Sequence, residues 1–456
     1  MAAKEAIDHI VILMQENRSF DHMLGYLSLP EGEGGAGRHD VAGLRGRNSD
    51  YNTYDGETYR IRRLRDTAAI DVDPPHDHTA AVNQIQGGSG PPDMSGFVAD
   101  YAGRIAQSGG DHKVGPGDIM GYFTEKETWA LGHFAKNFTV CDHWFSSLAG
   151  PTQPNRMYAL AGRAGSVDNK VSLPTPELWD VKPFFAYLPN DVDARSYSHD
   201  ISFLRMVDGY QAGVDFIDKV CRFYDRAHAG NLPALSWIDP NFSMSLLEPV
   251  DKLTSLGQWL HNQFDHLFGD EEPGCPYSLD IDNSDHPDDD IAHGERLMAA
   301  IYNALLKADP RLERTLFIVT YDEHGGFYDH VVPPGWDGAG FSDSYLADHP
   351  NVGPRVPTVA VSGRLEQGRP CHTPLDHTAL VRMILEKFAP DSLGDAPERV
   401  QAAPSLWDVL PWADTAPDTP FRPIHRMNRK PDNALRREVG AAAAKALDEK
   451  TPYEKL

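Results

Sequence analysis

The sequence predicts an α/β protein built on a largely parallel β-sheet, and three segments carry that prediction. Residues 10–14 (IVILM) and 316–320 (LFIVT) are short runs of mostly apolar, often β-branched side chains. Runs of this kind are typical of strands that are buried on both faces of a parallel sheet. Residues 292–306 place apolar side chains on one face at helical spacing, which predicts an amphipathic helix.

Other segments extend this pattern along the chain. Three further segments have strand character, namely residues 138–141, 234–238 and 356–361. A helix is expected over residues 124–134, where Thr124 and Glu127 have the spacing of a capping box. No internal repeat is present in the sequence.

The domain organisation follows from changes in composition. We expect one large domain over residues 1–400 and a short extension over residues 401–456. Residues 28–70 are rich in Gly, Arg, Asp and Asn, and residues 165–230 mix short strands, turns and helices. We expect both segments to be inserted loops of the large domain, the first a long surface excursion and the second facing the substrate.

Polar and acidic residues follow the two central strands. Glu16 and Asn17 come after the first apolar run, and Asp322 and Glu323 come after the second. Ligands bind beyond the carboxyl ends of parallel strands, so these side chains could converge on a divalent cation that prefers oxygen ligands. The alternative for each cluster taken alone is helix capping, a common role for acidic residues in this position.

A hydroxyl lies between the two clusters in the sequence. Thr152 follows the turn-forming pair Gly150 and Pro151 and precedes a segment that could open a helix. A hydroxyl at a helix N-terminus is well placed to meet a phosphate group. As a nucleophile it would need activation by a metal ion or a base, and simple helix capping is the alternative.

Composition narrows the class of partner. The formal net charge of −25 argues against a nucleic-acid binder and against attraction to anionic membranes, because both interactions require clustered Lys and Arg. The four cysteines have no C-x-x-C spacing, which disfavours a zinc ribbon or redox motif. No signal peptide or apolar run of membrane-spanning length is recognisable, so we expect a cytoplasmic protein. A secreted form whose signal has been removed is the alternative.

Three long motifs resemble those of a known family. Residues 9–22 (HIVILMQENRSFDH) resemble the opening motif of the bacterial phospholipase C and acid phosphatase family, which includes the plant non-specific phospholipases C. Residues 151–156 (PTQPNR) resemble the family's central nucleophile motif. Residues 320–330 (TYDEHGGFYDH) resemble its third long motif. The first and third of these motifs are highly specific.

Two shorter histidine motifs occur in the matching order. They are residues 71–76 (DVDPPH) and residues 286–287 (HP). The first departs from the family at Pro75, where relatives often carry Gly. The whole resemblance extends over most of the chain, from about residue 8 to about residue 388.

The resemblance implies an alkaline-phosphatase-like three-layer sandwich with a mostly parallel central sheet. It implies one divalent metal ion (calcium, magnesium, manganese or iron), with the ligands Glu16, Asn17, Asp322 and Glu323. Thr152 would be the nucleophile, and His76 and His286 would line the phosphate pocket. We also expect Asn155 and His330 to contact substrate. Independently of the resemblance, His330 and His377 follow strand or helix boundaries and could lie at the rim of the pocket.

The implied activity is that of a phospholipase C. A phospholipid would be cleaved to diacylglycerol and a phosphorylated headgroup through a phosphothreonine intermediate. The alternatives are an acid phosphatase acting on small phosphomonoesters and a non-catalytic lipid-binding relative, which the retention of the four ligands and Thr152 disfavours. Four aromatic residues could form an apolar wall for acyl chains or belong to the core, namely Tyr321, Phe327, Tyr328 and Trp336.

Overall fold

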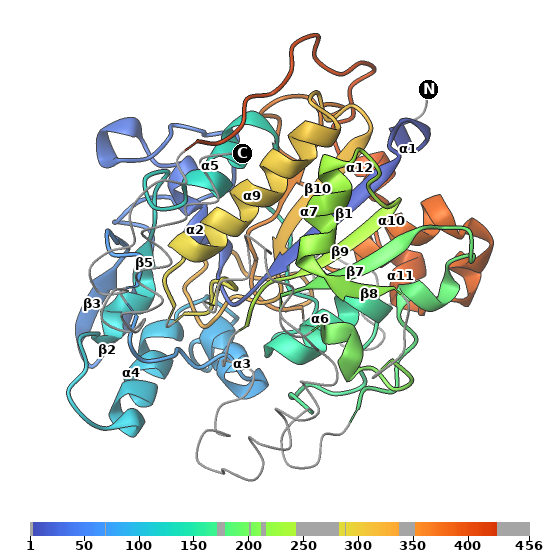
Figure 1. The fold of residues 1–456 in the computed structure, drawn as a ribbon. Coiled ribbons are helices and arrows are strands. Elements are labelled where there is room, and N and C mark those ends of the chain that lie inside the picture. The colour runs from blue at the N-terminus through green and yellow to red at the C-terminus, as the bar shows by residue number, and fades with distance from the viewer. Residues whose placement is uncertain are drawn as a thin grey trace, which may run out of the picture.

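A central β-sheet with helices packed around it forms the fold (Figure 1). The computed structural model describes residues 3–68, 70–170, 178–199, 202–210, 216–242, 282–287, 289–336 and 352–425. The strands are β1 His9–Gln15, β2 Tyr51–Tyr54, β3 Glu57–Arg60, β4 Arg62–Arg63, β5 Gly121–Tyr122, β6 Thr139–Val140, β7 Ala194–Ser198, β8 Ile217–Lys219, β9 Leu235–Asp239, β10 Thr315–Tyr321 and β11 Val359–Val361. The helices are α1 Ala3–Ala6, α2 Phe20–Met23, α3 His78–Gln86, α4 Phe97–Ser108, α5 Trp129–Asn137, α6 Thr152–Ala161, α7 Val220–His228, α9 Ala292–Ala308, α10 Thr378–Phe388, α11 Glu398–Ala402 and α12 Leu406–Val409.

Within the described residues, the central sheet has seven strands in the order β6-β11-β10-β1-β9-β7-β8. Strand β1 pairs in parallel with β10 and β9, and the parallel pairing continues through β7 to β8. Strand β11 runs antiparallel to both of its neighbours, β10 and β6. The predictions of an α/β fold and of a mostly parallel sheet are therefore confirmed.

The two apolar runs of the sequence lie side by side at the centre of the sheet. Every residue of β10 is buried, as is β1 after its first residue. The register pairs Gln15 at the end of β1 with Tyr321 at the end of β10. The residues that follow these two strands therefore emerge next to each other at one edge of the sheet.

Helices cover the sheet in two groups. Helices α5, α9 and α7 pack along one another, and α9 and α7 lie in front of the strands in Figure 1. Helix α10 packs against α6 and α12. Burial of β1 and β10 on both faces follows from this covering and explains their continuous apolar sequence. Among the residues that the structure describes, no helix is both long enough and apolar enough to cross a membrane.

Helix α5 begins later than the sequence predicts. Thr124 and Glu127 do bond, with both the backbone N–H and the hydroxyl of Thr124 donating to Glu127, but they close a turn before the helix. The first turn of α5 is instead capped by a distant side chain, because Ala130 and Leu131 donate their N–H groups to the carboxylate of Glu295 in α9. A cap from another helix has no local sequence signal.

The expectation of an inserted loop over residues 165–230 is wrong for most of the segment. It supplies β7 and β8, which form one edge of the central sheet, and helix α7. These strands are short and partly polar, so they lack the continuous apolar pattern of β1. Residues 28–70 supply β2, β3 and β4, which belong to two small sheets outside the central one.

The described part of residues 401–456 packs on the large domain. Arg382 of α10 donates to the carbonyls of Gln401 and Ala403 at 2.7 and 2.6 Å. Farther on, Asn303 of α9 donates to the carbonyl of Ile424 at 3.1 Å. Residues 401–425 are therefore part of the same body, while residues 426–456 lie outside the described residues.

Candidate active site

The predicted metal ligands come together beyond the carboxyl ends of β1 and β10. Asp322 accepts the N–H of Asn17 at 3.0 Å and the N–H of Glu323 at 2.7 Å with one carboxylate oxygen. Asn17 has a φ of 59°, a left-handed conformation in which Asn is enriched. Gly325 packs tightly on Asn17, since a Cβ there would lie 1.9 Å from the Asn17 carbonyl oxygen. The two long motifs therefore fit together through their backbones.

Thr152 is the first residue of α6 and faces this edge. Its hydroxyl donates to the side-chain oxygen of Asn17 at 3.1 Å, and the side chain is buried. The N-cap position is occupied by Pro151, so helix capping does not explain the hydroxyl. The structure thus brings the candidate nucleophile directly to a candidate metal ligand 135 positions away in sequence.

Arg156 is a buried member of this site to which the sequence patterns assigned no role. Its guanidinium donates to Asp322 at 3.0 Å and to Asp239 at 3.4 Å, and it lies 3.9 Å from Glu16. The sequence could have indicated its place in the site, because Arg156 is four residues after Thr152 and therefore lies near it on the helix. Asp239 likewise ends β9, the strand beside β1. Arg156 holds the carboxylates of three strand ends together.

Two carboxylate oxygens in this site have no hydrogen-bond partner. They are Oε2 of Glu16 and Oε1 of Glu323, and both are fully enclosed. Leaving a buried charged oxygen unpaired is costly, so such an atom points to a missing ligand. Oxygen atoms from Glu, Asn, Asp and Glu suit a hard or borderline divalent cation. The residues present therefore fit the metal ion that the family resemblance implies.

Burial dominates the electrostatics of these acids. It raises the pKa of Glu16 well above its ordinary value, although the Arg156 guanidinium counteracts it. The pKa of Asp322 is also raised by burial, again against the effect of Arg156. Burial acts the same way on Glu323, but the nearby His76 and His324 outweigh it and lower the pKa of Glu323. Burial thus disfavours the charged form of Glu16, whereas the neighbouring histidines favour the charged form of Glu323.

The two predicted pocket histidines lie near one another. The rings of His76 and His286 are 6.2 Å apart between centroids, and His76 Nε2 lies 3.4 Å from the side-chain nitrogen of Asn17. Burial alone would lower the pKa of His76, but the Asp73 and Glu323 carboxylates outweigh it and raise the pKa. Asp73, His76 and His286 also form one of three groups of side chains with metal-ligand spacing in the described residues.

His377 is buried, so its expected position at the rim is wrong. Its Nδ1 accepts a hydrogen bond from the Trp144 indole at 3.2 Å, which leaves Nε2 to donate to the Asp322 carbonyl at 2.7 Å. Burial lowers the pKa of His377 to about 4, which agrees with a neutral ring. His377 therefore supports the backbone of Asp322.

Asn155 and His330 are engaged in the framework. The Asn155 amide donates to the carbonyls of Leu148, Gly150 and Pro151 and is completely buried, so it holds the turn before α6. His330 contacts Asp21 at 2.6 Å. These contacts support positioning roles for both residues and give no support to the predicted contact with substrate.

The aromatic residues of the third motif belong mainly to the core. Tyr321 and Phe327 are completely buried, and Tyr328 is 5% exposed. Phe327 stacks on the His22 ring with centroids 3.8 Å apart. Trp336 is partly buried against the core. The packing therefore favours the core alternative for Tyr321, Phe327 and Tyr328.

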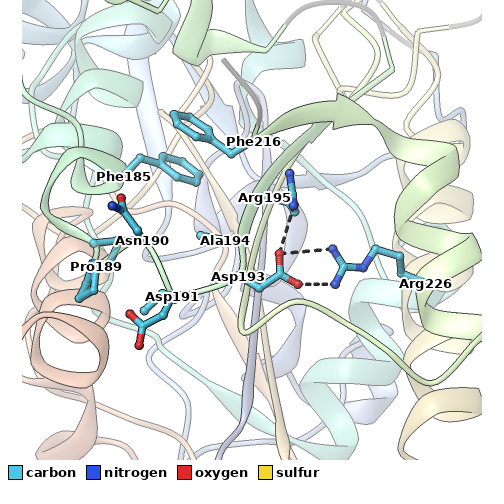
Figure 2. A pocket seen from close by; sticks show the side chains of 11 residues that line it. Phe185, Pro189, Asn190, Asp191, Asp193, Ala194, Arg195, Phe216 and Arg226 are labelled. Carbon is cyan, nitrogen blue, oxygen red and sulfur yellow. Dashed lines mark hydrogen bonds and ion pairs between the residues drawn. The ribbon is translucent and has the colours of Figure 1, made fainter. Parts of the chain in front are cut away.

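A surface hollow of about 620 Å³ lies at the opposite, amino-terminal end of β7 (Figure 2). Phe185 and Phe216 stack beside it with centroids 4.9 Å apart. Asp193 accepts hydrogen bonds from both Arg195 and Arg226, so one carboxylate offsets part of the positive charge that lines the hollow. None of the predicted site residues lines it.

The sequence belongs to the Phosphoesterase family, whose model matches residues 7–389. This match includes both strand-end clusters, Thr152 and the two pocket histidines. It confirms the family assignment suggested by the five motifs.

Named relatives include plant and bacterial phospholipases C. The chain is 30% identical to non-specific phospholipase C6 of Arabidopsis thaliana over 378 residues, which are 79% of this chain and 62% of the relative. It is 27% identical to hemolytic phospholipase C of Pseudomonas aeruginosa, over 84% of this chain and 53% of the relative. It is 25% identical to phospholipase C B of Mycobacterium tuberculosis, over 84% of this chain and 73% of the relative. The chain spans less than two thirds of the length of the plant relatives.

Solved structures with distant similarity include a phosphonate monoester hydrolase from Silicibacter pomeroyi, at 13% identity and a TM-score of 0.31 over 62% of this chain and 73% of the other. A sulfatase-like protein from Bacteroides thetaiotaomicron gives 11% identity and a TM-score of 0.34, over 65% of this chain and 72% of the other. Similarity at this level supports no argument about the site. The α/β assignment rests on the strand order and pairing described above.

Proposed function

We propose that this protein is a metal-dependent phosphoester hydrolase of the phospholipase C type. The observation that carries the proposal is the buried Thr152 hydroxyl, which donates to Asn17 beside carboxylate oxygens that lack partners. A nucleophile, a cation site and two histidines are the components of phosphoryl transfer by covalent catalysis. The names of the plant and bacterial relatives support a phospholipid substrate.

The metal ligands in the proposal are the four strand-end residues, Glu16, Asn17, Asp322 and Glu323. A divalent cation bound there would favour loss of the Thr152 proton and neutralise charge that develops on the phosphate. The chain itself contributes the position of the hydroxyl, because Asn17 fixes it and α6 begins at Thr152. The N-terminal end of a helix also favours a bound anion.

The reaction proposed is a double displacement. Thr152 Oγ1 attacks phosphorus, the bond from phosphorus to the glycerol oxygen breaks, and diacylglycerol leaves as an alcohol. In this proposal His76 and His286, whose ring centroids lie 6.2 Å apart, take up the hydroxyl proton and return one to the leaving oxygen. Water then attacks the phosphothreonine, which restores the hydroxyl and releases the phosphorylated headgroup.

Two substrates test the proposal in parallel. The metal-loaded enzyme should convert phosphatidylcholine to diacylglycerol and phosphocholine, and prior chelation should abolish the reaction. Reloading separate samples with calcium, magnesium, manganese or iron(II) would identify the ion that restores it. Phosphate release from a chromogenic monoester, without diacylglycerol from any common phospholipid, would instead favour the acid phosphatase alternative. Inactivity on both substrates with bound metal would favour the non-catalytic relative.

A further inference from the structure

A second cluster of metal-ligating side chains lies outside the active site, where two distant segments pair. Cys141 follows β6 and forms a parallel β-bridge with Cys371. Residues paired across such a bridge point to the same face, and successive residues alternate between faces. The next pair, Asp142 and His372, therefore meets on the face opposite the two cysteines. His143, the next residue after Asp142, completes the cluster. Because 230 positions separate Asp142 from His372, only the fold reveals this arrangement.

The carboxylate of Asp142 is the centre of the cluster. His143 Nδ1 lies 2.8 Å from one carboxylate oxygen, and His372 Nδ1 lies 3.0 and 2.9 Å from the two oxygens. One ligand atom from each residue lies within 4.8 Å of the others. The two rings are nearly perpendicular, at 84°, so both nitrogens converge on one region from different directions.

The carboxylate is rigid, while the histidines are accessible. Asp142 is completely buried, its Oδ2 accepts the Ala42 N–H at 2.8 Å, and its carbonyl accepts from Arg355 at 2.8 Å. The side chains of His143 and His372 are 30% and 57% exposed. His372 also lines a surface hollow of about 580 Å³, which gives an ion a path from solvent.

We propose that Asp142, His143 and His372 bind a divalent transition metal of borderline softness, such as Zn²⁺. Two imidazoles and one carboxylate are a ligand set that Zn²⁺ accepts in four-coordinate sites, with water in the remaining position. This preference separates the site from the oxygen ligands of the active site, which suit harder cations. The Ala42 N–H bonded to the carboxylate resembles the outer hydrogen bonds that orient metal ligands.

The other two groups with metal-ligand spacing in the described residues do not compete for this proposal. Asp73, His76 and His286 belong to the proposed active site. Asp21, Asp329 and His330 surround the Arg355 guanidinium, which already supplies the positive charge. An ion at Asp142 would join the segment after β6 to the segment around residue 372 and stabilise the folded state by mass action.

Zinc stoichiometry tests the proposal. Chelator-treated protein would be dialysed against buffered free Zn²⁺, and bound metal measured by mass spectrometry. The His143→Gln/His372→Gln variant should bind one zinc ion fewer than wild type and lose one zinc-dependent increase in thermal midpoint. Gln keeps polar side chains at both positions, so we expect this variant to fold. The matched control is His228→Gln, which changes an exposed histidine at the end of α7 and should bind as wild type does.

A second measurement needs no variant. Zn²⁺ should protect His143 and His372 of the wild-type protein from diethyl pyrocarbonate, as read by peptide mass spectrometry, while His228 stays reactive. Equal zinc content in wild type and the double variant, or no protection of His143 and His372, would overturn the proposal. In either case the two histidines would serve only as hydrogen-bond partners of Asp142.

Discussion

Two buried acidic clusters form where the first and third long motifs touch, and they differ in how their oxygens are satisfied. The closed cluster consists of Asp21, Asp329, His330 and Arg355. Arg355 bonds to both oxygens of Asp329 at 2.9 and 3.1 Å and to Asp21 at 3.1 Å. His330 donates its backbone N–H to the remaining Asp21 oxygen at 2.8 Å. Every carboxylate oxygen of the closed cluster has a partner.

The open cluster consists of Glu16, Asp322, Glu323 and Arg156. Its arginine bonds Asp322 directly but lies 3.9 Å from Glu16, and one oxygen of each glutamate has no partner. Both clusters contain one guanidinium, so the presence of an arginine does not distinguish them. The clusters differ in the oxygens without a partner, which mark the open cluster as the place for a ligand.

The largest expected effect concerns the hydroxyl beside the open cluster. Thr152→Val keeps the shape of the side chain and removes the proposed nucleophile, so turnover should fall about a thousandfold or more. The matched control is Thr152→Ser, which keeps a hydroxyl and should remain active. Steady-state kinetics on the preferred phosphoester checks both variants. Near-normal turnover by Thr152→Val would exclude covalent catalysis at this residue.

Breaking the closed cluster should instead damage stability. Arg355→Met removes the guanidinium that neutralises two buried carboxylates and should lower the free energy of unfolding by about 3–5 kcal/mol. Arg314→Met is the control, because Arg314 pairs with Asp8 at the surface and such a pair contributes about 1 kcal/mol or less. Urea denaturation measures the free energy of unfolding of both variants. A loss in Arg355→Met no larger than in the control would show that the closed cluster is not a structural element.

Asp285 shows a third way to neutralise a buried carboxylate, namely by a bound proton in place of an arginine or a metal ion. Burial raises its pKa to about 7, although the Tyr321 hydroxyl donates to it at 2.6 Å. Between about pH 4 and pH 7 the folded state therefore holds a proton that the unfolded state has lost. This group lowers stability as pH rises through that window, by up to about 1.4 kcal/mol per pH unit.

The Asp285→Asn variant should remove this contribution. Asn is uncharged, and it tolerates the positive φ of 73° at this position. Unfolding free energies of wild type and variant, measured from pH 4 to pH 8, should diverge as pH rises, with the variant relatively more stable at pH 8. Parallel curves would mean that Asp285 is ionised throughout this range in the folded protein.

Local sequence predicted the parts of the site that depend on one segment at a time. The apolar runs identify β1 and β10, and the polar residues directly after them identify Glu16 and Asp322. The motifs extend this reading to Thr152 and the pocket histidines. Glu16 and Asp322 directly follow strands and Thr152 begins a helix, where topology leaves little freedom of position.

Pairing between distant segments accounts for what local sequence could not predict. Asp21 and His330 lie in the same motifs as the proposed metal ligands, yet Arg355 draws them into the closed cluster. His377 is buried because Trp144 and the Asp322 carbonyl both bond to its ring. Such partners come from segments whose relative position exists only in the folded chain.

The most direct test asks whether the open cluster binds a metal ion and the closed cluster does not. Mn²⁺ is a suitable probe, since it favours oxygen ligands over imidazole. Titration calorimetry on chelator-treated protein would compare wild type, Glu16→Gln/Glu323→Gln and Asp329→Asn, with folding checked by circular dichroism. We expect one tight site in wild type and in Asp329→Asn, and at least about a hundredfold weaker binding in the double variant, because two charged ligands are lost. Unchanged Mn²⁺ affinity in a folded double variant would contradict the account.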